Sequence, residues 1–275
     1  MITRIAPTPS GYLHVGNCVN FLLVDWLARG LAGQVNLRID DVDAERYRTE
    51  YVDDIFRVLP WLAIDWQQGP RSRSEFEERF ASRDRVEYYR SHLAALEAAE
   101  LVYACECSRA DLRAADSRSC VKDCAGRHLP LVAGSTALRA RVPSGTRIEI
   151  DGEVIDVEAE LGDFVVWRRD DLPAYQLASL IEDRDAGITH VVRGRDLLPS
   201  TAAQLFLAPT LSAGNFSRAM FVHHDLVTGS DGSKLSKSQL GGGPMELDDD
   251  TYARIVEAAA GIALDVGLTP GAAPR

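Results

Sequence analysis

The sequence predicts an α/β fold in which a parallel sheet is divided by an α+β insert. Strand and helix patterns alternate before residue 99 and return after residue 173, and consecutive strand–helix–strand units build parallel sheets. Between these two parts, residues 99–173 contain a cluster of cysteines and several short strand patterns separated by turn signals. We therefore expect one sheet to be built from two halves that are separated in sequence by the insert.

The first half is expected to begin with a short strand and a turn that is stiffened by Pro7 and Pro9. A helix over about 16–31 follows, in which Cys18 is expected to be a core residue. Hydrophobic periodicity and polarity predict the remaining elements of this half. They are a strand (34–40), an amphipathic helix (49–62), a polar loop (70–83) and an amphipathic helix (84–100).

The start of the first helix is a candidate anion site. Unpaired N–H groups and the helix dipole favour phosphate at a helix N-terminus that follows a first strand. Asn17 is a good N-cap, Gly16 lets backbone approach backbone, and His14 stands where its imidazole can reach a bound phosphate. The alternative is an ordinary strand–turn–helix with a capping asparagine.

Three carboxylates, Asp40, Asp41 and Asp43, follow the second strand. In open α/β sheets, ligands bind at the carboxyl ends of the strands. This position therefore favours a functional role over an exposed acidic loop.

The insert contains a candidate zinc site. Cys105 and Cys107 form one pair, and Cys120 and Cys124 form a second pair after twelve intervening residues. Thiolates at such spacing suit tetrahedral Zn²⁺, and a small loop-rich insert gains folding energy from the metal. Buried free cysteines are the alternative, and His128 is a possible replacement for one thiolate.

The rest of the insert and the second half supply further elements. The insert is expected to contain strands over 137–142, 147–150, 153–157 and 164–169, with turns at Ser144-Gly145 and Asp151-Gly152. The second half is expected to contain a helix from 173, a strand over 188–194, a helix over 200–211 and a strand over 220–224. A short helix around 250–263 completes the prediction.

A cationic loop follows the last strand. It reads Asp231-Gly-Ser-Lys-Leu-Ser-Lys-Ser, and it places Lys234 and Lys237 three residues apart among small residues. Two lysines in a mobile loop make a clamp for a polyphosphate. Two surface lysines in a solvated loop are the alternative.

Composition limits the class of protein. The chain has 275 residues, of which 46% are hydrophobic and 26% charged, as in globular proteins with a sizeable core. No apolar run is long enough to span a membrane and no leader is visible, so we expect a cytoplasmic protein without a membrane partner. The net charge of -11 is opposite to that of a generic nucleic-acid binder, so any RNA contact must be local.

Two of these motifs resemble the signatures of class I aminoacyl-tRNA synthetases. His-Val-Gly-Asn at 14–17 is similar to the HIGH signature, and Lys-Leu-Ser-Lys-Ser at 234–238 is similar to KMSKS, in the same order and at a fitting separation. Further stretches resemble the glutamyl-tRNA synthetase catalytic core. They are Arg4-Ile-Ala-Pro-Thr-Pro-Ser-Gly, Leu37-Arg-Ile-Asp-Asp-Val-Asp, Gly162-Asp-Phe, Ala174-Tyr-Gln-Leu-Ala and Thr189-His-Val-Val-Arg-Gly.

The resemblance covers about residues 2–240 and implies a class I synthetase fold, a Rossmann-type parallel sheet split by a zinc-containing α+β insert. The implied segments are a first catalytic half (1–98), a zinc- and acceptor-binding insert (99–173), a second catalytic half (174–240) and a C-terminal helix and tail (241–275) without an anticodon-binding domain. A shortened core with a cysteine cluster is similar to the glutamyl-Q tRNA(Asp) synthetases. That group implies glutamate and ATP with Mg²⁺ as substrates, structural Zn²⁺, the queuosine base of tRNA(Asp) as acceptor, and a monomer.

The resemblance also implies site residues. The ATP-binding positions are His14, Gly16, Asn17, Lys234, Ser236 and Lys237, with His14, Lys234 and Lys237 as the catalytic residues. The glutamate-binding positions are Arg4, Ala6, Thr8, Asp40, Tyr175, Ser179 and Arg193, with Arg193 as the partner of the γ-carboxylate. The sequence departs from the family at Asn17, which replaces the final histidine of HIGH, at Asp40, where most relatives have glutamate, and at Cys120, where some have tyrosine.

Three other functions remain open at this stage. A tRNA-independent ligase would pass an adenylated amino acid to a small molecule or peptide, and the acidic charge and Asp40 fit it. A non-catalytic paralogue would bind tRNA or a protein, although the intact ATP and glutamate positions count against it. A nucleotidyltransferase of the same superfamily would explain the nucleotide signatures but not the glutamate positions. Three arginines of the insert, Arg109, Arg113 and Arg127, are either an RNA-presenting surface or plain surface charges.

Overall fold

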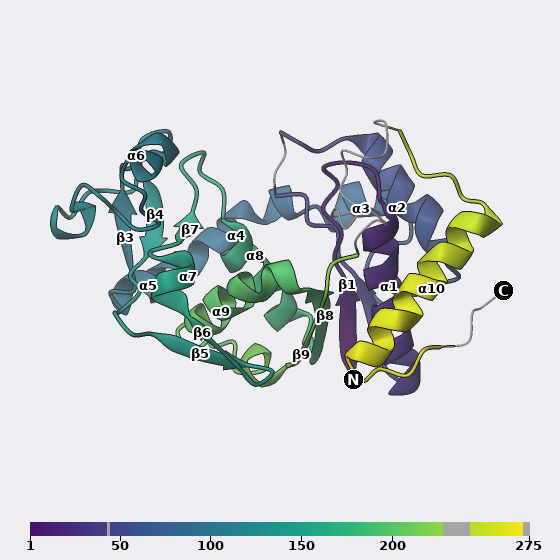
Figure 1. Cartoon of the computed structure of the whole chain (residues 1–275). Coiled ribbons are helices and arrows are strands. Elements are labelled where there is room, and N and C mark those ends of the chain that lie inside the picture. Colours follow the sequence, from purple (N-terminus) through teal and green to yellow (C-terminus); the bar gives the residue numbers. More distant parts are fainter. Residues whose placement is uncertain (43–44, 228–242, 272–275) are drawn as a thin grey trace. The chain divides into compact units, whose positions relative to one another are not determined.

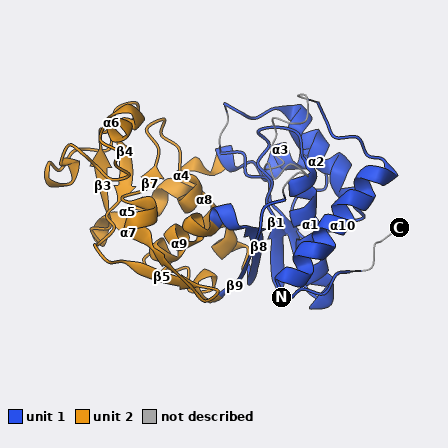
Figure 2. Cartoon of the chain, in the orientation of Figure 1, with its two compact units in different colours: residues 1–83, 188–197, 219–275 blue, residues 84–187, 198–218 orange. Residues whose placement is uncertain are grey.

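The computed structural model describes residues 1–42, 45–227 and 243–271, and the chain forms two compact units (Figure 1, Figure 2). Unit 1 comprises Met1–Arg83, Ile188–Leu197 and Ala219–Arg275. Unit 2 comprises Asp84–Gly187 and Leu198–Arg218. Each unit therefore contains segments that are far apart in sequence.

Unit 1 contains two pairs of parallel strands. β1 (Ile2–Ile5) pairs with β2 (Gln34–Leu37), and β8 (His190–Gly194) pairs with β9 (Met220–His224). β1 also contacts β8, and the backbone N–H of Thr189 donates to the carbonyl of Ile2 at 2.9 Å. The strands predicted at these four positions are confirmed.

Three helices supply most of the apolar core of unit 1. They are α1 (Val15–Gly30), α2 (Thr49–Trp61) and α10 (Asp249–Asp265), and α1 and α10 lie side by side (Figure 1). Leu22 of α1, Leu59 of α2 and Ile255 of α10 are fully buried in one cluster. These helices match the predicted ones, because each presents a long apolar stripe.

The loop predicted over 70–83 is wrong, because it contains the helix α3 (Arg73–Arg79). The Ser72 hydroxyl caps this helix by accepting the Glu75 N–H at 3.2 Å, and Phe76 is its single buried residue. A short helix with one apolar anchor has no periodicity that a sequence can show.

The single helix predicted over 84–100 is also wrong. The structure has a 3₁₀ turn (Ser82–Arg85), α4 (Val86–Ser91) and α5 (Leu93–Ala98). The break is at His92, whose N–H donates to the carbonyl of Tyr89, three residues earlier, at 3.2 Å. After α5 the chain turns through Glu100, which has a left-handed φ of 53°.

Unit 2 is built on antiparallel strands, and it contains short strands at the positions predicted for the insert. β3 (Val102–Cys105), β4 (Ala137–Ala140) and β7 (Val165–Trp167) form one sheet, and β5 (Arg147–Ile150) pairs with β6 (Glu153–Asp156) in a hairpin. The hairpin turns at Asp151 and Gly152, with φ of 51° and 80°. Two positive φ values in a two-residue loop fit a type I′ turn, and it lies at the Asp-Gly pair where a turn was predicted.

Helices complete unit 2. They are α6 (Arg109–Ala114), α7 (Val157–Leu161), α8 (Tyr175–Asp185) and α9 (Leu198–Leu207). The predicted insert, 99–173, lies inside unit 2. Unit 2 extends beyond the predicted insert, because α5 packs on β3, α8 packs on β7 and α9 packs on β5. The strand predicted through 157 ends earlier, because the Asp156 carboxylate caps α7 by accepting the Ala159 N–H at 3.0 Å.

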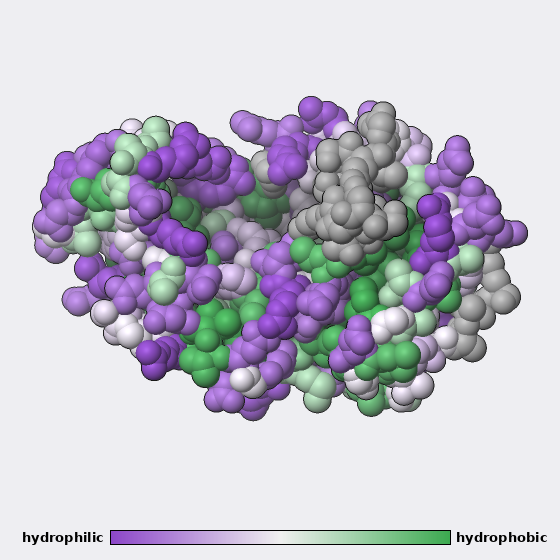
Figure 3. Space-filling model, in the orientation of Figure 1, coloured by the Kyte–Doolittle hydropathy of each residue, from purple (hydrophilic) through white to green (hydrophobic). Residues whose placement is uncertain are grey.

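The visible surface is largely hydrophilic and is interrupted by small apolar patches (Figure 3). This agrees with the high content of charged residues. Among the residues that the structure describes, no helix combines the length and apolar character that a membrane span requires.

Candidate active site and cysteine cluster

The start of α1 presents His14 rather than Asn17 as its cap. His14 is the N-cap residue, with an extended backbone (φ -128°, ψ 170°), and its own N–H donates to the Asn17 side-chain oxygen at 3.1 Å. The predicted N-cap at Asn17 is therefore wrong, because Asn17 lies three residues inside the helix and completes a capping box. Both side chains nevertheless lie at the predicted helix N-terminus.

Gly16 sets the position of the His14 ring. A Cβ atom added at Gly16 would lie 3.1 Å from Cε1 and 3.2 Å from Nδ1 of His14. The backbone approach predicted at Gly16 is not found, because the atoms nearest to such a Cβ belong to the His14 imidazole. A side chain at position 16 would displace the ring.

Buried Asp54 of α2 anchors the turn that precedes α1. Its carboxylate accepts the Leu13 N–H at 2.8 Å and pairs with the Arg57 guanidinium at 2.6 Å. Arg57 also donates to the carbonyl of Met245 at 3.0 Å. Because Leu13 directly precedes His14, this network fixes the chain that carries the imidazole.

Arginines gather at the carboxyl ends of the strands of unit 1. Arg4 on β1 and Arg193 on β8 are 4% and 3% exposed, and Arg4 donates to the Val192 carbonyl at 3.3 Å. The Arg193 guanidinium lies 5.8 Å from the centre of the Phe221 ring. Burial, followed by the nearby charges of Arg193 and Arg195, lowers the pKa of His223 to about 3, so this imidazole is neutral at pH 7. The strand ends therefore form an electropositive region that suits an anionic ligand.

One carboxylate lies at the adjacent strand end. Asp40 accepts two hydrogen bonds from Arg38, at 2.6 and 3.2 Å, and its N–H donates to the carbonyl of Pro7 at 2.9 Å. This backbone bond continues the β1–β2 pairing past the ends of both strands. It holds the segment that contains Ala6 and Thr8 alongside Asp40.

Asp41, the second carboxylate of this run, is 1% exposed. It accepts the Ser82 N–H at 2.6 Å, and the Arg83 guanidinium lies 3.5 Å away. Burial raises the pKa of Asp41 to about 6, although the Ser82 hydrogen bond and the Arg83 charge oppose the shift. Asp41 thus ties the end of β2 to residues 82–83, while Asp43 lies outside the described residues.

Two predicted positions lie in unit 2. Tyr175 is the first residue of α8 and is 37% exposed, whereas Ser179, one turn later, is buried. The loop with Lys234, Ser236 and Lys237 falls outside the described residues. The structure places Arg4, Ala6, Thr8, Asp40 and Arg193 in unit 1 and Tyr175 and Ser179 in unit 2. The glutamate-binding role of all seven stays a prediction.

The four cysteines of the insert form one cluster. The sulfur atoms of Cys105, Cys107, Cys120 and Cys124 all lie within 4.8 Å of one another. The Cys107 sulfur is 3.6 Å from that of Cys120 and 4.0 Å from that of Cys124. Tetrahedral Zn²⁺ with bonds of about 2.3 Å separates its sulfur ligands by roughly 3.8 Å, so this donor set fits the ion. All four cysteines are free thiols rather than disulfides.

Electrostatics distinguish the thiols. Burial raises the pKa of Cys105 to about 12, whereas at Cys120 backbone N–H donors outweigh burial and lower the pKa to about 7. One of these donors is the Cys124 N–H, at 3.2 Å from the Cys120 sulfur. Among the described residues the only metal-compatible cluster contains the four sulfurs and omits His128, which instead lines a neighbouring pocket.

Sequence reasoning missed several residues near the site. Nε2 of buried His224, at the end of β9, lies 3.0 Å from the Asn20 side-chain oxygen on α1. Arg38 forms an ion pair with Asp40. The two residues lie two positions apart at a strand end, and this spacing could have predicted the pair. The Asn20–His224 pair spans 204 residues, so no local pattern reveals it.

The chain is similar to known proteins in sequence and in fold. Residues 1–257 match the family model described as tRNA synthetases class I (E and Q), catalytic domain. Glutamate–tRNA ligase 2 of Nitrosococcus oceani is 35% identical over an alignment of 268 residues, and the match covers 91% of this chain and 56% of that protein. The chain therefore spans about half the length of such curated relatives.

A shorter relative and a solved structure extend the comparison. Glutamyl-Q tRNA(Asp) synthetase of Symbiobacterium thermophilum is 35% identical over an alignment of 257 residues, and the match covers 85% of this chain and 77% of that protein. The crystal structure of a glutamate tRNA ligase from Elizabethkingia meningosepticum, in complex with its amino acid, superposes with a TM-score of 0.69 at 23% identity. It covers 88% of this chain and 53% of the other, and it shows a shared fold.

Proposed function

This chain belongs to the class I tRNA synthetases of the glutamate and glutamine group, and from that premise we propose that it activates glutamate with ATP and transfers it to RNA. The proposed acceptor is the queuosine base of tRNA(Asp). The relative with the glutamyl-Q name supports this choice, because the match covers 77% of its length.

The buried arginines at the strand ends carry the proposal. Arg4 and Arg193 are almost fully buried at the strand ends, and the charges of Arg193 and Arg195 add to burial in keeping the His223 imidazole neutral, so this region favours an anionic group. The γ-carboxylate of glutamate would pair with Arg193, while the carboxylate of Asp40 would receive the amino group. Glutamine would lose the charge-assisted pair with Arg193 and should be rejected.

Adenylate formation needs alignment more than proton transfer. The glutamate α-carboxylate, already ionised at pH 7, attacks the α-phosphorus of ATP, and the bond from that phosphorus to pyrophosphate breaks. The N-terminus of α1 and His14 would hold the phosphates, with Gly16 and Asn17 shaping the approach. Lys234 and Lys237, with Ser236 in the same loop, would close over the leaving group, to which Mg²⁺ bound with ATP contributes charge.

Transfer completes the proposed reaction. A hydroxyl of the acceptor attacks the acyl carbon of the adenylate, and AMP leaves. We assign Ala6, Thr8, Tyr175 and Ser179 to the glutamate pocket on the family pattern. The two parallel strand pairs would form one Rossmann-type sheet, split by the insert 99–173 between the catalytic halves 1–98 and 174–240. Cys105, Cys107, Cys120 and Cys124 would hold Zn²⁺ in a closed, structural site.

The first test is ATP–pyrophosphate exchange with glutamate in the absence of RNA. Exchange with glutamate and not with glutamine supports the proposed pocket, and Arg193→Ala should reduce it by at least 100-fold, about 3 kcal/mol. Exchange that appears only after tRNA is added would favour a tRNA-dependent synthetase. No exchange with any amino acid, with or without tRNA, would refute the proposal.

The second test concerns the acceptor. Radiolabelled glutamate should transfer to tRNA(Asp) that contains queuosine and not to the same tRNA without it. Equal transfer to both would refute the queuosine assignment. Exchange without transfer to any tRNA would favour the tRNA-independent ligase.

A further inference from the structure

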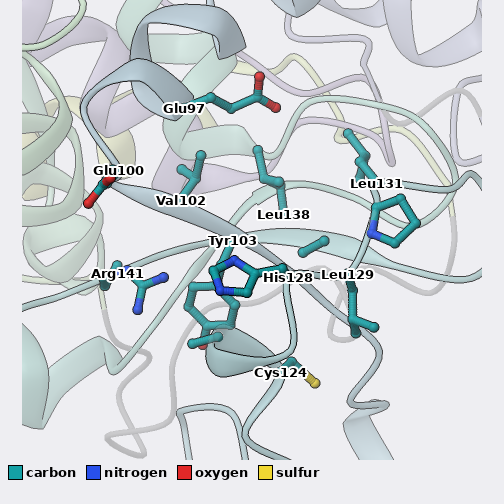
Figure 4. Close-up of a pocket in the computed structure, with 13 residues that line it drawn as sticks. Glu97, Glu100, Val102, Tyr103, Cys124, His128, Leu129, Leu131, Leu138 and Arg141 are labelled. Carbon is teal, nitrogen blue, oxygen red and sulfur yellow. The ribbon is translucent and has the colours of Figure 1, made fainter.

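Unit 2 contains a pocket that the proposed reaction does not use (Figure 4). Its volume is about 460 Å³, within the range of small-molecule sites. Buried Val102 and Ala104 of β3 and Leu138 of β4 supply its apolar floor. Leu129 and Leu131, from the segment that follows Cys124, supply a half-buried wall. The pocket therefore lies beside the cysteine cluster and shares Cys124 with it.

The rim of this pocket has two kinds of polar group. Glu97, near the end of α5, and Glu100 contribute carboxylates, whereas His128 and Arg141 contribute an imidazole and a guanidinium. All four side chains are exposed, and none makes a hydrogen bond or ion pair with another residue in the described part of the chain. Figure 4 shows the Glu97 carboxylate and the His128 ring on opposite sides of Val102 and Leu138. The rim therefore offers acceptors at Glu97 and Glu100 and donors at His128 and Arg141, with Glu97 and His128 on opposite sides of the apolar floor.

Arg141 also provides a stacking surface. Its guanidinium lies 5.2 Å from the centre of the Tyr103 ring, and the Tyr103 hydroxyl donates to Asp163 at 2.6 Å, which fixes the ring. A guanidinium held on an aromatic ring is restrained, and its other face can stack on a base. Single-stranded nucleic acids are commonly bound on such planar groups.

A nucleotide has the polarity that this pocket requires. The exocyclic amine of cytosine, adenine or guanine donates to carboxylates, as glutamate accepts from cytosine N4, whereas phosphate accepts from arginine and histidine. Uracil has no exocyclic amine. We propose that this pocket binds one unpaired nucleotide of the RNA acceptor, with its base stacked on Arg141, its exocyclic amine toward Glu97 and Glu100, and its phosphate toward His128. This inference rests on the proposed function for its RNA partner.

The first experiment measures binding of CMP, GMP and UMP by calorimetry, with a stable glutamyl-adenylate analogue filling the catalytic site. CMP and GMP should bind at least fivefold more tightly than UMP. Arg141→Ala should weaken CMP binding at least tenfold, and Glu97→Gln should remove the preference over UMP. Two exposed hairpin residues outside the pocket give matched controls, Arg147→Ala and Glu149→Gln, which should change binding by less than twofold.

The second experiment separates the source of the nucleotide. Arg141→Ala should raise the KM for the RNA acceptor about tenfold while leaving RNA-independent pyrophosphate exchange unchanged. Equal binding of all three nucleotides, or no binding at 10 mM, would overturn the pocket. If CMP binds but Arg141→Ala leaves the KM for RNA unchanged, the ligand of the pocket is a free nucleotide and not a nucleotide of the RNA acceptor. Absence of pyrophosphate exchange in the unaltered protein would instead refute the proposed function. The CMP titration would still test the pocket in that case.

Discussion

The absence of a side chain at position 16 leaves room for the His14 imidazole. Gly16→Ala would place a Cβ 3.1–3.2 Å from that ring and force it to move. We expect the rate of pyrophosphate exchange to fall 10- to 100-fold, since a positioned phosphate contact of this kind contributes about 1.4–3 kcal/mol to the barrier. The measurement is exchange rate at saturating glutamate, with urea unfolding to show that stability changes little.

The same helix offers a matched control. Gly30 ends α1, and a Cβ there would meet nothing within 4 Å. Gly30→Ala should leave the exchange rate unchanged and alter stability by at most about 1 kcal/mol. Equal rates for the two variants would contradict the role given to the His14 ring.

Asp41 predicts a pH dependence of stability. Burial raises its pKa in the folded chain to about 6, above the value near 3.9 of an unfolded aspartate. Between these values the folded state binds more protons than the unfolded state, so stability falls as pH rises through this range. The contribution of the protonated carboxyl is fully present below about pH 4 and is lost above about pH 6.

Asp41→Asn tests this sign, because the amide oxygen can still accept the Ser82 N–H but does not ionise. The stability of the unaltered protein relative to the variant should decrease by about 2 kcal/mol from pH 4 to pH 7. Urea unfolding at several pH values measures the difference, from which carboxylates shared by both proteins cancel. Parallel stability profiles would contradict a raised pKa.

At the scale of elements, α8 is held to α4 through Glu182. Its carboxylate accepts from the Tyr89 hydroxyl at 2.5 Å and pairs with Arg85, whose pKa is raised mainly by the charge of Glu182 against the opposing effect of burial. Because α8 begins with Tyr175 and contains Ser179, this contact positions a helix assigned to the glutamate pocket. Glu182→Gln should destabilise the protein by about 1–3 kcal/mol, measured by urea unfolding.

Glu87 of α4 provides the comparison. Its side chain is 85% exposed and lies 3.4 Å from Arg90, so Glu87→Gln should change stability by no more than about 0.5 kcal/mol. Similar small effects of both substitutions would show that the Glu182 contact does not secure α8.

The elements that could be predicted are those with a strong local signal. The helix α2 has four apolar residues on one face, and the β5–β6 turn has an Asp-Gly pair. The helix α3 depends on one buried phenylalanine and a serine cap, and α7 depends on the Asp156 cap, so neither has a repeated pattern. The break at His92 arises from local hydrogen bonding that composition does not encode.

Across the whole molecule, motifs identified parts of the site but not the contacts between distant segments. The cysteine spacing predicted a cluster, and the structure brings the four sulfurs together. The Leu13–Asp54 and Asn20–His224 contacts join residues 41 and 204 positions apart, and only the folded chain reveals them. Such long-range pairs depend on tertiary packing, in which α1 contacts β1, β2, β8 and α10, and no single segment specifies that packing.

The two compact units predict a divided response to loss of metal. The cysteine cluster belongs entirely to unit 2, and Cys105 is the last residue of β3, whereas β1, β2, β8 and β9 belong to unit 1. We expect about one zinc per chain, because four thiolates complete one tetrahedral site. Its removal by a chelator should increase amide hydrogen exchange in β3 and β4 at least tenfold, because binding energy that stabilises the insert is lost.

After zinc removal, the amide hydrogen-exchange rates of β1 and β2 should stay within twofold of their rates in the zinc-loaded protein, since the core around these strands is formed by α1, α2 and α10. Hydrogen exchange with mass spectrometry measures both units in one sample. Cys124→Ser should reduce zinc content well below one per chain, whereas Cys18→Ala, which alters the buried cysteine of α1, should leave zinc content unchanged. Equal deprotection of both units would show that the metal stabilises the chain as a whole, and unchanged exchange after complete zinc removal would show that the cluster does not support the insert.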